Sequence, residues 1–256
     1  MSNDPSSRPV LELDQVRLAF EGEEVLRGVC LRAMQGERLV ILGRSGSGKS
    51  TLLRLILGIV KLVSGSVKFE GAEVSQMGRG RLNQMRSRIG MVYQYSALIS
   101  SLNVRDNLAL PLEELTDKST REIEAIVDEK LALVGMADAK NKMPAELSGG
   151  MRKRVGFARA LVLDPALILY DEPTAGLDPV ISAVIDELII TLSEKIEVTS
   201  IIVTHEMSSA FKVATRMAML YEGRIILDDT PGHFRESTDP VVAQFIHGEV
   251  DGPILR

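Results

Sequence analysis

The glycine-rich stretch GRSGSGKS, residues 43–50, constrains the fold more than any other part of the chain. It follows the apolar run Leu39–Leu42, which has the pattern of a buried strand. It precedes TLLRLILGIV, residues 51–60, whose leucines and isoleucines mark one side of a helix. A strand, a glycine loop and a helix in this order form the first unit of an α/β fold.

The loop also has a chemical consequence. Its glycines let main-chain N–H groups turn inward around the β- and γ-phosphates of a nucleotide, and the positive N-terminus of the following helix favours the same anion. Lys49 adds a positive charge, and the Ser50 hydroxyl is a suitable ligand for Mg²⁺. The stretch therefore predicts a site for a nucleoside triphosphate and magnesium.

The rest of the chain alternates between strand and helix patterns. Strand or hairpin patterns occur at residues 10–42, 67–74, 89–94, 166–172, 199–205 and 217–229. No strand is evident between 95 and 163, where apolar residues recur at helical spacing. We therefore expect an α/β core that is interrupted by an α-helical insertion.

Composition and charge exclude several classes of protein. Hydrophobic residues make up 45% of the 256 and charged residues 25%, which is typical of globular chains. The formal net charge is −5 without a long single-sign run, which argues against binding nucleic acid through bulk basicity. No signal-peptide core is evident, and no run approaches the roughly 18 apolar residues that span a bilayer. Any membrane role must therefore come through a partner.

The only cysteine is Cys30, so an intrachain disulfide is excluded. It stands in the apolar context VLRGVCLRAM, and we expect a buried core thiol.

Two acidic residues end the strand expected at 166–172. At the carboxyl end of a strand beside a phosphate loop, Asp171 is suited to hold Mg²⁺, directly or through water. Glu172 is suited to orient the attacking water or to accept its proton. The alternative is a strand that merely ends in a solvated acidic turn.

A series of motifs then appears in a fixed order along the chain. They are GRSGSGKST, a strand ending in Gln94, LSGG at 147–150, LILYDE at 167–172, AGLD at 175–178 and a strand ending in His205. This order and spacing resemble those of the ATP-binding cassette (ABC) ATPases, from about Val10 to Asp228.

The resemblance implies a fold and a domain organisation. The fold would be α/β: a P-loop NTPase core of ABC ATPase type with an antiparallel β subdomain and an inserted α-helical subdomain. A flexible N-terminal tail (1–9) would precede the ATPase domain (10–228), and a C-terminal extension (229–256) would follow it. Within the ATPase domain, the core and β subdomain would take 10–94 and 164–228, and the helical subdomain about 95–163.

The resemblance also implies roles for single residues in ATP hydrolysis. The catalytic residues would be Glu172, His205 and Lys49, and the ligands of Mg²⁺ would be Ser50, Gln94 and Asp171. ATP would be contacted by Phe20, Gly43, Arg44, Ser45, Gly46, Ser47, Gly48, Lys49, Ser50, Thr51, Gln94, Ser148, Gly149, Gly150 and Asp178.

Structural alternatives stay open for some of these residues. Phe20, implied to stack on adenine, falls on the same strand face as Val16 and Leu18 and also suits the core. Gln94, implied to touch Mg²⁺ and relay to a membrane partner, is otherwise a surface glutamine. Asp178, implied to lie at a dimer seam, is otherwise a helix-capping residue.

The LSGG stretch implies a second copy of the chain. Ser148, Gly149 and Gly150 offer a hydroxyl and two unobstructed N–H groups at the start of a helix, which suits an anion. In the family this stretch closes on ATP held by the opposite subunit, so one copy of each motif implies a homodimer or pairing with a close relative. ATP binding would favour closure, and hydrolysis with product release would favour opening.

Two further features are similar to the ATPases of MCE-associated (Mla-type) lipid transporters. Met151 follows LSGG where most cassettes have glutamine, and the C-terminal segment reads VVAQFIHGEVDGPI at 241–254. Each feature has an alternative explanation. Met151 is then a neutral replacement of the glutamine, and residues 241–254 are a plain surface segment. The TAGLDP stretch is the common cassette form and differs from that of some Mla-type ATPases.

This branch implies a set of partners. An integral membrane permease dimer would dock near 95–112, although the apolar residues there also suit the core. An MCE-domain protein would bind the lipid, and the chain would lie peripherally on the cytoplasmic face of the inner (plasma) membrane. A small-solute importer or exporter is the alternative, and an ABC ATPase acting on nucleic acid is a remote one. The lipid species, the direction of transport and a small regulatory subunit are left open.

Overall fold

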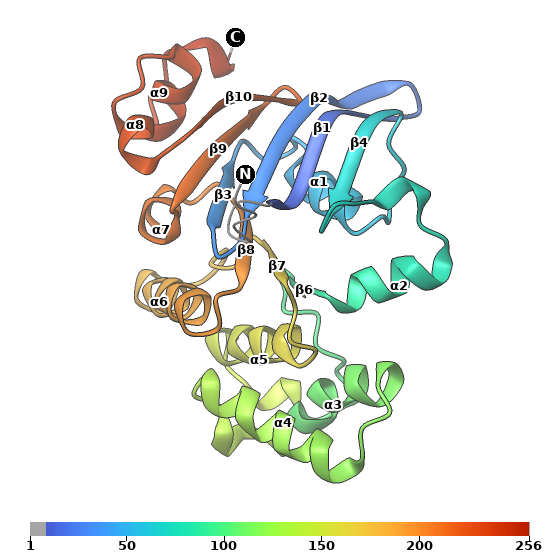
Figure 1. Cartoon of the computed structure of the whole chain (residues 1–256). Coiled ribbons are helices and arrows are strands. Elements are labelled where there is room, and N and C mark those ends of the chain that lie inside the picture. Colours follow the sequence, from blue (N-terminus) through green and yellow to red (C-terminus); the bar gives the residue numbers. More distant parts are fainter. Residues whose placement is uncertain (1–8, 256) are drawn as a thin grey trace, which may run out of the picture.

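The computed structural model describes residues 9–255, and its strands form two sheets (Figure 1). The larger sheet has the order β10-β9-β3-β8-β7-β6. Its strands are β3 (Arg38–Leu42), β6 (Ile89–Val92), β7 (Leu167–Asp171), β8 (Thr199–Thr204), β9 (Arg216–Tyr221) and β10 (Arg224–Asp229). All pairings are parallel except that of β10 with β9.

The smaller sheet is antiparallel, with the order β2-β1-β4-β5. Its strands are β1 (Pro9–Phe20), β2 (Glu23–Met34), β4 (Ser64–Phe69) and β5 (Ala72–Glu73). Helix α1 (Lys49–Ile56) packs between the two sheets, because its buried Leu52 and Leu53 share one core with Leu11 of β1 and Ile41 of β3. The smaller sheet therefore covers the first helix of the α/β unit.

The central strands are buried on both faces, as expected for a parallel sheet between layers. In β3, Leu39 and Ile41 belong to the core under the smaller sheet, whereas Val40 and Leu42 belong to the core on the opposite face. This double burial explains why the strands before the functional loops read as continuous apolar runs.

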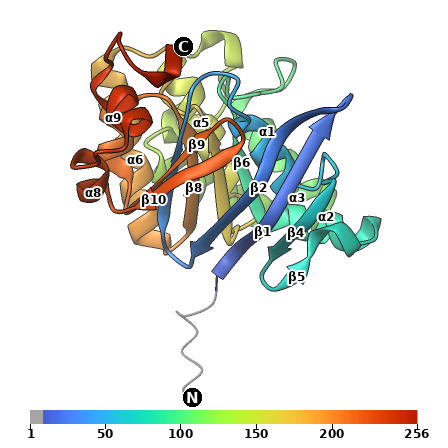
Figure 2. The same ribbon diagram turned by 90° about the horizontal axis from the view of Figure 1, so that it is seen from above.

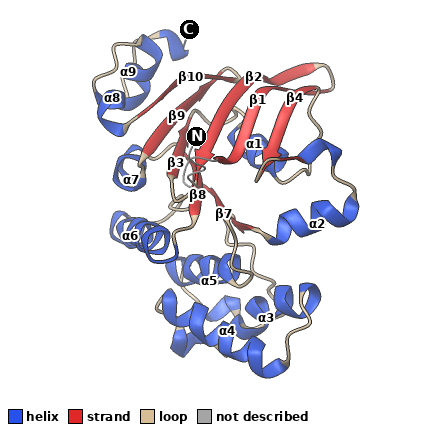
Figure 3. Cartoon of the chain, in the orientation of Figure 1, coloured by secondary structure: helices blue, strands red, loops and turns tan. Residues whose placement is uncertain are grey.

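Helices cover the face of the larger sheet that is turned away from the smaller sheet, and they flank both sheets (Figures 2 and 3). They are α2 (Arg79–Ser87), α3 (Val104–Leu115), α4 (Thr120–Leu133), α5 (Gly149–Leu161), α6 (Pro179–Ile196), α7 (Met207–Val213), α8 (Pro231–Arg235) and α9 (Pro240–His247). Between β6 and β7, where every residue is described, the chain forms helices and no strand, as the sequence predicts. Helices α3, α4 and α5 lie together at the lower end of the molecule in Figure 1, and α5 also packs on β6. Among the described helices, none is both long enough and apolar enough to cross a membrane.

Local signals account for where these helices begin. Ser119 accepts a hydrogen bond from the Glu122 main chain while the Glu122 carboxylate accepts one from the Ser119 main chain, which forms a capping box at the start of α4. Asp178 caps α6 without a reciprocal bond, by accepting from the N–H groups of Val180 and Ile181, and Pro179 fills the first helical position.

The prediction of a buried Cys30 is wrong, because Val29 and Leu31 of β2 point to the core and place the intervening cysteine on the exposed face. Its Sγ accepts hydrogen bonds from the main chain and side chain of Gln15, at 3.3 and 3.1 Å. The expected tail at 1–9 lies outside the described residues except for Pro9, with which β1 begins.

Gly90 of β6 lets α5 lie close to the larger sheet, because a β-carbon there would be 2.5 Å from the Ala160 carbonyl oxygen. We expect Gly90→Ala to lower the free energy of unfolding by about 1–3 kcal/mol, since the helix must shift to make room. Urea denaturation measures this change. The control is Gly80→Ala in α2, where nothing lies within 4 Å of the added carbon. It should leave stability unchanged or raise it by about 0.5–1 kcal/mol, and equal losses in both variants would contradict the packing explanation.

Candidate active site

A cavity of about 380 Å³ lies where the glycine loop meets the ends of β1, β7 and β8. Its lining residues are Phe20, Val25, Ser45, Gly46, Gly48, Lys49, Ser50, Thr51, Gln94, Glu172 and His205. The chain thus brings together residues from distant segments, and only Val25 was not among those expected at the site.

The glycine loop disfavours a side chain at Gly43 and at Gly48, for different reasons. A β-carbon at Gly43 would lie 2.4 Å from the Leu220 carbonyl oxygen and 2.6 Å from Ser47 Oγ. Gly48 precedes α1 with a φ of +101°, which side chains rarely adopt, and an added carbon there would meet Val25 at 3.2 Å. The conformation of the loop therefore depends on its backbone and not on its own side chains.

Two loop residues with side chains, Arg44 and Ser47, do not line the cavity. The Ser47 hydroxyl is buried and has no hydrogen-bond partner among the described residues. Arg44 is exposed, and its Nη1 donates to the Ile254 carbonyl at 2.7 Å. This bond ties the glycine loop to the C-terminal segment, which the sequence did not indicate.

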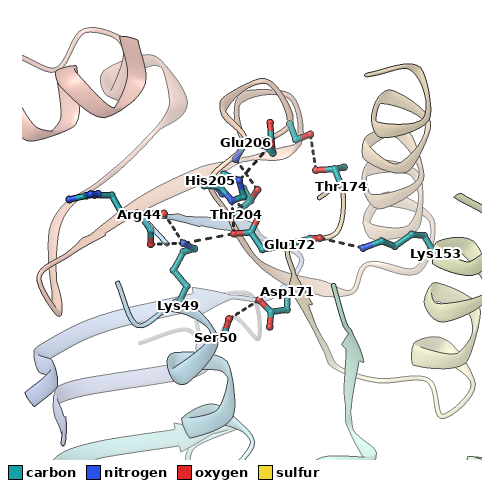
Figure 4. Close-up of polar contacts among 12 residues, drawn as sticks. Arg44, Lys49, Ser50, Lys153, Asp171, Glu172, Thr174, Thr204, His205 and Glu206 are labelled. Atoms are coloured by element: carbon teal, nitrogen blue, oxygen red, sulfur yellow. Dashed lines mark hydrogen bonds and ion pairs between the residues drawn. The ribbon is translucent and has the colours of Figure 1, made fainter. Parts of the chain in front are cut away.

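Lys49 is folded back over the loop (Figure 4). Its Nζ donates to the carbonyls of Gly43 and Arg44, at 2.6 and 3.0 Å, and lies 3.8 Å from Glu172 Oε1. Burial lowers the pKa of Lys49, while the nearby carboxylates of Glu172 and Asp171 oppose the shift. A positive charge held in this way, beside main-chain N–H groups, suits phosphate oxygens.

Ser50 and Asp171 meet across the loop. Ser50 Oγ donates to Asp171 Oδ1 at 3.0 Å. Burial raises the pKa of Asp171, and the hydrogen bond from Ser50 opposes the shift. These are hard oxygen donors of the kind that Mg²⁺ prefers, and Mg²⁺ commonly takes few protein ligands together with substrate phosphates and water. The described residues contain no cluster of three or more His, Cys, Asp or Glu that would hold a metal by itself.

Glu172 has a strained backbone and a confined carboxylate. Its φ of +49° is in the left-handed region, which costs a residue with a β-carbon about 1–3 kcal/mol. Its N–H donates to the Val203 carbonyl at 3.0 Å, and its Oε1 lies 2.9 Å from His205 Nδ1. The side chain is 11% exposed. A carboxylate so placed at the cavity wall can orient a water molecule or accept its proton.

Phe20 lies at the end of β1 and is 46% exposed, so it is not a core residue despite sharing its strand with Val16 and Leu18. An exposed aromatic ring at the cavity wall is free to stack on a planar ligand.

Gln94 lies two residues beyond the end of β6, is half-buried and also lines the cavity.

The LSGG residues lie apart from this cavity. Ser148 begins α5, and its Oγ accepts a hydrogen bond from the Met151 main chain at 3.3 Å. A β-carbon at Gly149 would lie 3.5 Å from Leu177, and one at Gly150 would lie 2.8 Å from Ile181. Gly149 and Gly150 therefore lie beside the start of α6, and none of Ser148, Gly149, Gly150 and Asp178 lines the cavity of their own chain.

The sequence did not indicate Lys153 and Arg159 of α5. Lys153 Nζ donates to the Gln94 carbonyl at 2.5 Å and to the Glu172 carbonyl at 3.4 Å (Figure 4 draws the second). Burial lowers the pKa of Lys153 to about 8, against the charges of Glu172 and Asp171. Arg159 donates to the carbonyls of Ser96 and Ala97. In the sequence, Lys153 belongs to the basic run MRKR, which is typical of a solvated helix face, and Arg159 follows that run by five residues.

Curated relatives cover most of the chain. It is 41% identical over 244 residues to the probable ribonucleotide transport ATP-binding protein mkl of Mycobacterium tuberculosis, with 95% of this chain and 68% of that protein covered. It is 37% identical over 230 residues to the intermembrane phospholipid transport system ATP-binding protein MlaF of Escherichia coli, covering 90% and 86%. The chloroplastic protein TRIGALACTOSYLDIACYLGLYCEROL 3 of Arabidopsis thaliana is 36% identical over 262 residues, covering 96% and 75%.

Solved structures have the same fold. The ATP-binding cassette MJ0796, described as a dimer in a post-hydrolysis state bound to ADP and Pi, superposes with a TM-score of 0.77 at 31% identity, covering 86% of this chain and 98% of that one. The cbiO1 protein of Clostridium perfringens, part of the ABC transporter complex cbiONQ, gives a TM-score of 0.84 at 29% identity and covers 92% and 94%.

The family model described as ABC transporter matches residues 26–175, which is more than half of the chain. This match, the relatives and the geometry of the cavity agree with the motif order. The chain belongs to the ABC transporter family and is an ATPase of the ATP-binding cassette type.

Proposed function

We propose that the chain is the ATP-hydrolysing motor subunit of a transporter that moves phospholipid or a related lipid between membranes of the cell envelope. The observation that carries the proposal is 37% identity over 90% of the chain to a protein named for intermembrane phospholipid transport, together with Met151 after LSGG. The Arabidopsis relative, whose name is that of a galactolipid, supports the same substrate class.

ATP would occupy the cavity at the glycine loop, with its phosphates on Lys49 and the loop N–H groups and its adenine on Phe20. Ser50, Asp171 and Gln94 would hold Mg²⁺, which when bound neutralises phosphate charge. Glu172 would orient the attacking water and take its proton, and His205 would contact the γ-phosphate. The contacts that support these roles are the 3.0 Å bond of Ser50 to Asp171 and the 2.9 Å bond between His205 and Glu172.

We also propose that two copies of the chain complete two sites between them. Ser148 and the two glycines after it lie away from the cavity of their own chain, yet they present a helix N-terminus to the outside. The related cassette MJ0796, solved as a dimer with ADP and Pi, supports an arrangement in which they reach the nucleotide of the opposite copy.

Permease subunits would dock on the segment after Gln94. Tyr95 is 86% exposed and Ile99 is 40% exposed, whereas Val104, Leu108 and Leu112 in the same segment are buried in the core. The exposed residues are those suited to a partner. The chain would then lie on the cytoplasmic face of the membrane beneath a permease dimer, and an MCE-domain protein would bind the lipid. The helices between Gln94 and β7 would form the subdomain that carries this surface.

A second candidate is a transporter of a small solute. It is favoured by the 41% identity to a protein named for ribonucleotide transport. The two candidates share the motor and differ in the partner subunits.

Lys49→Ala should weaken ATP binding by at least tenfold, about 1.4 kcal/mol, because the phosphates lose a charge held at the loop. Isothermal titration with ATP and Mg²⁺ measures it. Lys195→Ala is the matched control, since Lys195 is an exposed lysine in the last turn of α6. If Lys49→Ala bound ATP with an affinity within twofold of that of the unmodified chain, the result would contradict the placement of the phosphates.

Glu172→Gln should lower kcat for ATP hydrolysis by about 100-fold or more, since the amide cannot accept a proton. ATP affinity should stay within threefold, and size-exclusion chromatography with ATP and Mg²⁺ should show a dimer. Glu187→Gln is the control, because this α6 carboxylate is 65% exposed and pairs with Lys212. Hydrolysis at the unmodified rate by Glu172→Gln would refute Glu172 as the base.

The substrate class is tested by purifying the tagged chain with its membrane partners and extracting bound lipid. We expect an integral permease, an MCE-domain subunit and phospholipid enriched over the surrounding membrane. ATPase activity of this complex in vesicles should respond to phospholipid composition and not to added ribonucleotides. A solute-binding subunit in place of the MCE protein, with stimulation by ribonucleotide, would establish the second candidate instead.

A further inference from the structure

The cationic side chain of Lys153 lies almost wholly inside the protein. It is 4% exposed, although it stands in the basic run MRKR, in which the preceding Arg152 is exposed. A buried ammonium group is costly unless its protons are hydrogen-bonded. The described residues give it no carboxylate within ion-pair distance, so its partners are main-chain carbonyls.

These two carbonyls belong to residues that follow neighbouring parallel strands and that both line the nucleotide cavity. One is that of Gln94, at 2.5 Å, just beyond β6, and the other is that of Glu172, at 3.4 Å, just beyond β7. The side chains of both residues line the cavity. The single ammonium group of Lys153 therefore holds the main chain of both Gln94 and Glu172, two polar residues that line the nucleotide cavity.

Both segments need such support because their backbones are strained. Glu172 has a φ of +49°, and after Gln94 the chain continues through Ser96 at +61° and Ala97 at +48°. Conformations of this kind persist only where the surroundings determine them. Arg159, further along α5, donates to the Ala97 carbonyl at 2.7 Å and to that of Ser96 at 3.1 Å. Helix α5 thus fixes the segment 94–97 from both ends and Glu172 from one side.

We propose that Lys153 is a positioning residue for ATP hydrolysis, whose ammonium group holds the main chain of Gln94 and Glu172 so that their side chains face the γ-phosphate. The proposal rests on the assignment of Glu172 as the base. Lys153 touches neither the nucleotide cavity nor the reacting atoms, so it acts through Gln94 and Glu172. Because Ser148 begins the same helix, Lys153 also links the LSGG end of α5 to the base by one rigid element.

The role requires a cationic donor and not merely a long side chain. A charged donor makes a hydrogen bond roughly twice as strong as a neutral one. Methionine matches the length of lysine without donating, whereas arginine retains the charge and several N–H donors. The pair of substitutions therefore separates packing from hydrogen bonding.

The experiment compares Lys153→Met and Lys153→Arg in the full chain, with ATP and Mg²⁺. Lys153→Met should lower kcat by at least tenfold, while ATP affinity and KM change less than threefold. Lys153→Arg should recover kcat to within threefold of the unmodified chain. Amide hydrogen exchange, which does not depend on turnover, should be at least threefold faster in a peptide covering residues 94–97 of Lys153→Met.

A second buried lysine supplies the control. Lys130 of α4 is 7% exposed and pairs with Asp164, in the turn after α5, and with Glu129 of its own helix, at 2.7 and 2.9 Å. Lys130→Met also removes a buried ammonium group, but it should leave kcat per folded molecule and exchange at 94–97 unchanged. Thermal unfolding of each variant checks that the measured chains are folded.

Three results would overturn the proposal. They are an unmodified kcat in Lys153→Met, a loss of ATP affinity equal to the loss of kcat, and unchanged exchange at 94–97. Glu172→Gln is measured beside these variants. If Glu172→Gln hydrolyses ATP normally, the assignment of the base fails. If it is inactive while Lys153→Met is fully active, only the role of Lys153 fails.

Discussion

The buried carboxylate of Glu172 lies between the ammonium group of Lys49 and the imidazole of His205, 3.8 and 2.9 Å away. A buried carboxylate without partners is strongly unfavourable, and Lys49 and His205 supply the polar contacts that Glu172 needs at the cavity wall. They come from the glycine loop after β3 and from the end of β8, and β8 lies between β3 and β7 in the sheet. The parallel order of these strands is what brings their carboxyl ends, and hence the three side chains, together.

Much of this arrangement could be predicted because the relevant signals are local. An apolar run that is followed by a glycine loop, or by Asp171 and Glu172, indicates a buried strand. The polar residues after the run also indicate which end of that strand carries the functional side chains. The α/β fold and the family were predicted from such motifs, and both are confirmed by the matching family and structures. The roles of the individual site residues stay predictions, although most of those expected at the nucleotide line one cavity.

The features that escaped prediction depend on contacts between distant segments. Lys153 and Gln94 are 59 residues apart, and Arg44 reaches Ile254 across 210 residues, so no local pattern identifies either contact. The error at Cys30 has a different cause. Apolar neighbours on both sides suggested the core, but in a strand the neighbours of a residue point to the opposite face. The exposure of Phe20 likewise depends on where β1 ends, which its sequence pattern does not specify.

The LSGG stretch connects the local site to a larger assembly. Its serine caps the helix that carries Lys153, and its glycines pack against Leu177 and Ile181 beside Asp178.

We infer that this LSGG surface completes the ATP site of a second copy of the chain. The most direct test is a structure of the Glu172→Gln chain with ATP and Mg²⁺. We expect a dimer in which Ser148 of one copy lies within hydrogen-bond distance, about 3 Å, of the γ-phosphate held at Lys49 of the other. ATP bound in a single copy with its γ-phosphate facing solvent, or a dimer that holds Ser148 away from the nucleotide, would contradict it.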